Sequence, residues 1–178
     1  MITEPLPYTL DVRKAAVRGV EVSGVLRPPK LRYYRELLAD DAGSIRAVLA
    51  FSRDEENRYL IHIVTDAEGL VICQRCLEPM PMQLHTDNLL AVVWNNEQAS
   101  HLPRHLDPLI VAEDEDCSLW RLVEEELMLG LPQFNYHNTQ DCKQRLARFT
   151  QPQPEEGQRE RKPNPFNVLE NLKPGKRS

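Results

Sequence analysis

Two cysteines two residues apart, Cys73 and Cys76, are the residues of this chain best suited to chemistry. They follow a short apolar run typical of a strand, and Pro79 and Pro81 prevent a helix from continuing beyond them. The sequence therefore places both thiols at a strand end or in a turn. Thiolates at this spacing can hold one metal ion if two further ligands come from elsewhere in the chain.

Two other uses of the cysteine pair stay open at this point. A thioredoxin-like redox pair normally begins a helix, whose dipole stabilises the first thiolate. Here no helix follows, and the carboxylate of Glu78 disfavours a neighbouring thiolate, with only partial compensation from Arg75. Redox chemistry is therefore less favoured than metal binding. The plainest alternative is that both cysteines are small buried packing residues.

A second pair of metal ligands could come from His137 and Cys142, which lie five residues apart in a polar stretch. Three thiolates and one imidazole suit the tetrahedral coordination of a structural zinc ion. The chain has no second CxxC motif, so a surface position for His137 and an inert Cys142 remain the alternative. The metal hypothesis thus assigns zinc to Cys73, Cys76, His137 and Cys142.

Other residues with suitable chemistry are better explained by structure. His101 and His105 have the spacing of helical metal ligands, but Pro103 lies between them. The glutamates at 124–126 point in different directions on a helix and are expected on a solvated face. Cys117 is expected to be a packing cysteine. The sequence offers no nucleophile with an adjacent base, no phosphate-binding glycine loop and no paired carboxylates on one face.

The elements that must position these residues are mostly strands. Apolar residues alternate at 44–52 and again at 59–64, which predicts a β-hairpin. Residues 66–69 are expected to turn the chain into another strand that ends at Cys73, and 82–94 supplies one or two further strands. Short connections between strands favour an antiparallel sheet over βαβ units.

Helices are expected on either side of this run of strands. Residues 118–131 have a serine N-cap and one apolar face, and 30–39 is a second candidate. Residues 95–116 are polar and expected to be irregular. The predicted fold class is α+β, with an antiparallel β-sheet in the N-terminal and middle part packed by a helix from the C-terminal half. A flexible tail ending in a short helix follows.

The chain has 178 residues, which suits one domain with a tail. We expect a domain at 1–149, a flexible linker at 150–162 and a short amphipathic, basic interaction motif at 163–178. In that motif a cap and a proline begin a helix whose apolar residues share one side, although the segment could instead dock on its own domain. The motif residues are Asn164, Pro165, Phe166, Leu169 and Leu172.

Charge is unevenly distributed along the chain. The net charge is −5, of which residues 158–178 contribute +4 and the remainder −9. Contacts to nucleic acid are therefore expected through the tail, unless the basic end is only solvated. No apolar run is long enough to span a membrane, and residues 1–7 do not resemble a signal peptide. A cytoplasmic protein with reduced cysteines is expected.

Three separated segments together resemble the YceD family of large ribosomal RNA subunit accumulation proteins. Their order and spacing match over nearly the whole chain, although the N-terminal third carries little that is diagnostic. Many members carry a cysteine where this chain has His137, which supports a metal site and makes His137 a departure from the pattern. The segments are Cys73-Gln74-Arg75-Cys76-Leu77, Val123-Glu124-Glu125-Glu126-Leu127 leading into Leu131-Pro132 and residues 137–142, and Lys162-Pro163-Asn164-Pro165-Phe166 with Leu169 and Leu172.

The resemblance implies a non-enzymatic role in the synthesis, processing or stability of 23S ribosomal RNA. Expected partners are large-subunit RNA or precursor particles, with ribosomal proteins or assembly factors, and neither a membrane nor a small-molecule substrate is expected. One alternative is a metal-dependent RNA-processing enzyme, which would need carboxylates and histidines around an open metal position. Another is an adaptor that binds only proteins of large-subunit assembly.

Overall fold

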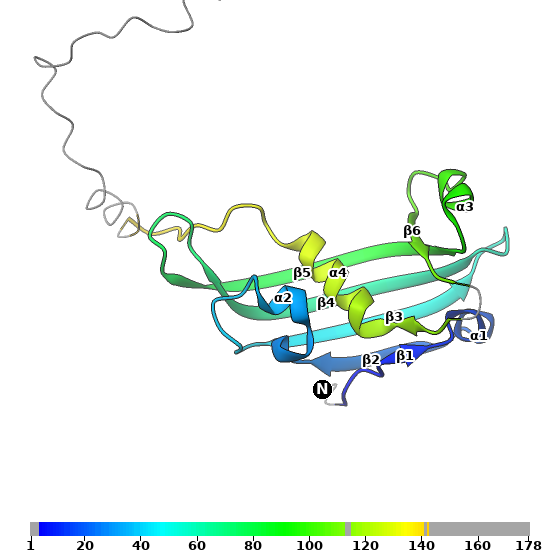
Figure 1. Cartoon of the computed structure of the whole chain (residues 1–178), viewed down its shortest axis with the longest axis horizontal. Coiled ribbons are helices and arrows are strands. Elements are labelled where there is room, and N and C mark those ends of the chain that lie inside the picture. Colours follow the sequence, from blue (N-terminus) through cyan, green and yellow to red (C-terminus); the bar gives the residue numbers. More distant parts are fainter. Residues whose placement is uncertain (1–3, 113–114, 141, 143–178) are drawn as a thin grey trace, which may run out of the picture.

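A computed structural model of the chain describes residues 4–112, 115–140 and 142. Its main element is a five-stranded sheet with the order β2-β3-β4-β5-β6, and β1 and β7 form a separate two-stranded sheet (Figure 1). All neighbours in the larger sheet are antiparallel except β5 and β6, which are parallel. In chain order the elements are β1 (Thr9–Leu10), α1 (Val12–Arg18), β2 (Glu21–Leu26), a 3₁₀ turn (Pro28–Lys30), α2 (Arg32–Arg35), β3 (Ser44–Arg53), β4 (Tyr59–Ile72), β5 (Pro79–Val93), α3 (Asn96–Ser100), β6 (Asp107–Ile110), β7 (Cys117–Ser118) and α4 (Leu119–Gly130).

The sheet has one covered face and one exposed face. Along β3, Ile45, Ala47 and Leu49 are fully buried, whereas the polar residue between the first two, Arg46, is exposed. This alternation places one set of side chains against the helices and the other set in solvent. Figure 1 shows α2 and α4 on the same face of the sheet. The predicted α+β class with a mainly antiparallel sheet is confirmed.

Helix α4 is the main helix packed on the sheet, as the sequence predicts. Ser118 is its N-cap, and the Ser118 hydroxyl accepts a hydrogen bond from the backbone N–H of Arg121 at 3.4 Å. At the other end, Gly130 lies so close to β5 that an added Cβ would come within 2.5 Å of the Thr86 methyl group. The apolar face of the helix, made by Leu119, Leu122, Val123 and Leu127, is buried.

The turn expected at residues 66–69 is wrong, because β4 continues unbroken through this stretch. Asp66 and Glu68 are polar because they lie on the exposed face of the sheet, where Asp66 contacts His85 on β5 at 2.8 Å. Strand β5 is likewise continuous from Pro79. The prolines at its start are tolerated because β6 pairs only with the far end of β5, so this part of β5 is a sheet edge among the described strands.

The helix expected at 30–39 forms only in part, as the four residues of α2. Only α2 and the preceding 3₁₀ turn form, because Leu31 is extended between them and the chain leaves the helix after Arg35. The backbone N–H of Ala39 instead donates to the Leu70 carbonyl on β4, at 2.7 Å. Residues 95–116, expected to be irregular, contain α3 and β6. The short length of both elements explains why periodicity does not reveal them.

Two expectations concern membranes and the tail. None of the helices in the described ranges is long and apolar enough to cross a bilayer. The expected linker at 150–162 and the motif at 163–178, with Asn164, Pro165, Phe166, Leu169 and Leu172, lie outside the described residues.

Candidate metal centre

The CxxC motif forms the turn that joins the two longest strands, β4 and β5. The turn is closed by hydrogen bonds of 2.9 Å from the Cys73 N–H to the Glu78 carbonyl and from the Leu77 N–H to the Cys73 carbonyl. Leu77 has a φ of 60°, in the left-handed region that disfavours leucine. The thiols therefore sit in a tight turn at a strand end, as the sequence predicts.

The loop that follows α4 reaches the same end of the sheet as this turn (Figure 1). Gln74 binds the loop twice. Its backbone N–H donates to the Asn135 carbonyl at 2.9 Å, and its side-chain amide donates to the Gln133 carbonyl at 3.2 Å. These bonds bring His137 and Cys142 to the β4–β5 turn, more than sixty residues away in sequence.

All four residues of the metal hypothesis converge at this turn. Their ligand atoms lie within 4.8 Å of one another. The sulfur of Cys73 lies 3.6 Å from that of Cys142, and the sulfur of Cys76 lies 3.3 Å from Nδ1 of His137. The three cysteines are buried and His137 is half-buried. A group with this composition could hold a metal ion.

Two of the distances between ligand atoms are close to those of a tetrahedral zinc site. Zinc–sulfur and zinc–nitrogen bonds of about 2.3 and 2.05 Å at tetrahedral angles place two sulfurs about 3.8 Å apart and a sulfur and nitrogen about 3.6 Å apart. The Cys73–Cys142 and Cys76–His137 distances differ from these values by about 0.2 to 0.3 Å. Four protein ligands leave no coordination position for a substrate, which is the arrangement of a structural site.

The thiols of the cluster differ in their tendency to ionise. Burial opposes the ionisation of Cys73, but backbone N–H groups of Cys76, His137 and Arg75 outweigh it and lower the Cys73 pKa to about 5. For Cys142, burial and hydrogen bonds with the sulfurs of Cys73 and Cys76 raise the pKa. One thiolate is thus stabilised by the turn itself, whereas further thiolates crowded beside it need a cation for stability.

Aromatic residues and one arginine surround the cluster. The guanidinium of Arg75 lies 4.8 Å from the ring centre of Tyr136 and donates to the Cys142 sulfur at 3.9 Å. The rings of Phe134 and Tyr136 are nearly parallel, with centres 6.3 Å apart. The contacts of Arg75 attach the loop to the turn independently of any metal, and the stacked rings lie within the loop.

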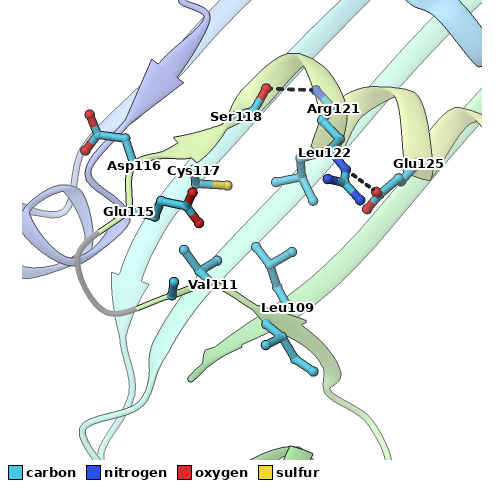
Figure 2. A pocket seen from close by; sticks show the side chains of 11 residues that line it. Leu109, Val111, Glu115, Asp116, Cys117, Ser118, Arg121, Leu122 and Glu125 are labelled. Carbon is cyan, nitrogen blue, oxygen red and sulfur yellow. Dashed lines mark hydrogen bonds and ion pairs between the residues drawn. The ribbon is translucent and has the colours of Figure 1, made fainter. Parts of the chain in front are cut away.

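Away from the cluster, a hollow of about 290 Å³ lies between β6 and the start of α4 (Figure 2). It contains a thiol, but burial and then the charge of Glu125 raise the pKa of Cys117 to about 11, which makes a poor nucleophile. Glu125 itself pairs with Arg121 at 2.8 Å. The described residues that line this hollow include carboxylates but no histidine, so no imidazole is present there to accept the proton of the thiol.

Sequence comparisons connect the chain to a known family. The profile described as "Large ribosomal RNA subunit accumulation protein YceD" matches residues 61–173, well over half of the chain. A protein of that name from Haemophilus influenzae (strain ATCC 51907 / DSM 11121 / KW20 / Rd) is 30% identical over 169 residues, covering 94% of this chain and 96% of the relative. The chain belongs to the YceD family. No solved structure matches this YceD-family chain significantly.

Sequence reasoning missed two residues that organise this YceD-family protein. Gln74 lies between the cysteines and holds the ligand-bearing loop, yet nothing in its sequence context distinguishes it from a solvated turn residue. Glu124 is buried, contrary to the solvated face expected for the glutamates at 124–126, and one of its oxygens accepts hydrogen bonds from the backbone of α2. Glu126 is also buried, beside Asn88.

Proposed function

We propose that the protein supports the accumulation of 23S ribosomal RNA in the cytoplasm by binding large-subunit RNA or precursor particles, without catalysing a reaction. Family membership supports this role, because the matched relative is named for accumulation of large-subunit ribosomal RNA. The observation that carries the binding mechanism is the closed group of three cysteines and one histidine. Such a group serves as a structural centre when it binds zinc.

In this proposal Cys73, Cys76, His137 and Cys142 hold zinc. The ion would supply a cross-link between the β4–β5 turn and the loop after α4. Two observations support this proposal: Gln74 holds the loop against the turn, and the sulfurs of Cys73 and Cys76 lie 3.6 and 3.3 Å from the ligand atoms of Cys142 and His137. The cross-link stabilises a binding surface and leaves no open metal position for hydrolysis.

The enzyme alternative requires a different set of residues. A metal-dependent nuclease binds its ions through carboxylates and histidines and leaves a position for water or phosphate. Among the described residues, the group that could hold an ion is rich in thiols. The buried Cys117 with its raised pKa also does not provide an activated nucleophile. Both observations favour binding over catalysis.

Depletion of the protein in its own bacterium tests the role. We expect the ratio of 23S to 16S ribosomal RNA to fall, and the wild-type chain supplied in trans to restore it. A chain carrying Cys73→Ser should restore the ratio incompletely at raised temperature, where loss of the cross-link matters most. An unchanged ratio after full depletion would contradict the proposed role.

A cleavage assay separates binding from catalysis. The purified protein is incubated with precursor 23S RNA and with magnesium, manganese or zinc. We expect binding without cleavage. Specific cleavage that disappears when a cluster residue is replaced would overturn the non-enzymatic proposal and favour the nuclease alternative. Association with precursor particles that survives complete ribonuclease digestion would instead favour the protein-only adaptor.

A further inference from the structure

A groove with aromatic walls lies between α2 and α4, and none of the cluster residues lines it. It has a volume of about 430 Å³ and is lined by Tyr8, Tyr33 and Trp120 together with basic residues. The two helices are in direct contact on the covered face of the sheet (Figure 1). Tyr8 and Tyr33 are more than half exposed. Large aromatic surfaces are therefore open to a ligand in a defined hollow.

The aromatic rings are held in place by other contacts. The indole N–H of Trp120 donates to the Leu6 carbonyl at 2.9 Å, which fixes the plane of the ring. Tyr8 packs edge-on against Trp120, with ring centres 5.2 Å apart. The backbone of Tyr33 is anchored beside them, because its N–H donates to the carboxylate of Glu124 at 2.6 Å. A flat ligand would thus meet an indole ring that is already positioned and a tyrosine ring on an anchored backbone.

Cations lie over the same rings. The Lys30 ammonium is 5.8 Å from the Trp120 ring centre, and the Arg32 guanidinium is 5.5 Å from the Tyr33 ring centre. Within the described part of the chain, neither Lys30 nor Arg32 forms an ion pair with a carboxylate. Both charges remain available to an anionic ligand.

The acidic residues of the groove are already engaged. Glu124 accepts hydrogen bonds from the backbone N–H groups of Tyr33 and Tyr34, and Glu125 pairs with Arg121. The groove is therefore locally favourable to anions, although residues 1–157 as a whole carry a charge of −9. Positive charge next to open aromatic faces matches a ligand that combines flat rings with phosphates.

We propose that this groove binds a short unpaired segment of RNA, with a base stacked on the exposed ring of Tyr33 and phosphates near Lys30 and Arg32. The proposal rests on the proposed ribosomal RNA function and adds a direct contact site to it. An acidic peptide would satisfy the two cations but would not require flat aromatic platforms, so the rings favour RNA. The basic tail can bind the same RNA independently.

Binding of the full-length protein to a fluorescently labelled 12-nucleotide single-stranded RNA tests the site by anisotropy. Tyr33→Phe should bind like wild type, because the stacking face is retained. Tyr33→Leu keeps an apolar side chain but loses the flat ring, and should bind about tenfold more weakly. Wild-type affinity for Tyr33→Leu would overturn the stacking contact.

The contribution of Lys30 and Arg32 is measured separately, as the dependence of RNA affinity on salt concentration. Replacing both Lys30 and Arg32 with alanine should reduce the slope of log affinity against log salt by about 1.4, since each phosphate contact to a single strand contributes about 0.7. Arg53→Ala is the matched control, because Arg53 is an exposed arginine that lies 5.5 Å over the Tyr59 ring outside the groove. Because the control removes one charge and not two, a loss of slope of about 0.7 in Arg53→Ala would contradict a specific site.

Photo-crosslinking of the same complex distinguishes the groove from the tail. Nucleotide adducts on Tyr33 or Trp120 support the proposal, whereas adducts confined to residues outside the groove overturn it. If the groove variants bind RNA normally but lose a protein partner in ribonuclease-treated extracts, the occupant is a protein and the inference is wrong. These assays use purified RNA, so their failure is distinguishable from an unchanged 23S ratio after depletion.

Discussion

At the scale of single residues, Cys73 is the most informative ligand of the cluster, because it is fully buried and its sulfur lies 3.6 Å from that of Cys142. Cys73→Ser should remove zinc from the purified protein and lower the free energy of unfolding by about 2 kcal/mol or more. This change corresponds to about 4–8 °C in Tm for a chain of this size. Elemental analysis and thermal unfolding measure the two effects together.

Cys117→Ser is the matched control for that prediction. Cys117 is also a buried cysteine, but it lies on β7, just before α4, and outside the cluster. Its replacement should cost stability through the buried hydroxyl while leaving the zinc content unchanged. Equal zinc content in the wild type and in Cys73→Ser, with the same Tm, would show that the cluster is not a metal site.

The buried Glu126 is expected to make the stability of the folded protein depend on pH. Burial raises the pKa of Glu126 above its ordinary value of 4.5, and the nearby charge of Asp107 acts in the same direction, although the hydrogen bond from Asn88 opposes both. The folded state therefore binds more protons than the unfolded state in this range. The contribution of the Glu126 carboxyl group to the free energy of unfolding must fall as the pH rises from about 4.5 through the higher folded-state pKa.

Glu126→Gln should remove this dependence. The amide keeps an oxygen that can accept from Asn88 but carries no charge, so the variant should be more stable than wild type at pH 7 and lose that advantage near pH 4. Denaturant unfolding at both pH values measures the difference. An advantage of the same size at both pH values would contradict a charge effect. Glu21→Gln, at an exposed position of β2, serves as the control.

The buried glutamates show what residue type alone does not reveal. Glutamate on a helix is usually solvated, and the position of Glu124 becomes intelligible only when α2, about 90 residues earlier, supplies two N–H groups. Similarly, the sequence identified the four cluster residues by their chemistry but not by their proximity. That proximity depends on Gln74, whose role comes from the tertiary path of a loop.

At the scale of elements, Glu124 couples α2 to α4. Helix α2 has only four residues, too short to be stable alone, and one oxygen of Glu124 accepts from the N–H groups of Tyr33 and Tyr34 at 2.6 and 3.0 Å. Glu124→Ala should destabilise the protein by about 2–3 kcal/mol, because two buried donors lose a charged acceptor. Glu124→Gln should cost less, since an oxygen remains.

Hydrogen exchange measured residue by residue checks this coupling. In Glu124→Ala the amides of Tyr33 and Tyr34 should exchange faster, whereas those in the centre of β3 should change only as far as global stability changes. Glu125→Gln, on the exposed face of α4, should leave the α2 amides protected. Unchanged protection of both tyrosine amides in Glu124→Ala would contradict the capping role.

Helices and strands were predictable from the sequence where the pattern that specifies them lies within the element itself. The alternation in β3 and the cap and apolar face of α4 follow from neighbouring residues, so both elements form as the sequence predicts. The polar residues at 66–69 resemble a turn when the sequence is considered alone. In the sheet they are exposed strand residues, and Asp66 pairs with His85 on the neighbouring strand. The parallel strand β6 depends on pairing with β5 and has only four residues. Both the continuous β4 and the short β6 depend on pairing with distant strands, and a single sequence does not reveal which strands pair.

At the scale of the whole molecule, the cluster connects the sheet to the part of the chain that leads to the tail. Cys142 is a proposed ligand, and residues 143–178 follow it in sequence, so the proposed cross-link would fix the point from which they continue. Anchoring the chain at Cys142 would set the position to which the proposed motif around Phe166 is tethered while it binds a partner. Its effective concentration then depends on the length of the intervening chain.

This arrangement predicts that the cluster and the motif can be disabled separately. Phe166→Ala should leave zinc content and Tm unchanged and weaken co-sedimentation with large-subunit precursor particles by about tenfold, because an apolar anchor is lost from a tethered motif. Cys73→Ser should do the reverse at low temperature, lowering zinc content and Tm while the motif still binds. If Phe166→Ala instead lowers Tm as much as Cys73→Ser, the segment packs on its own domain, and the proposal of a separate interaction motif is wrong.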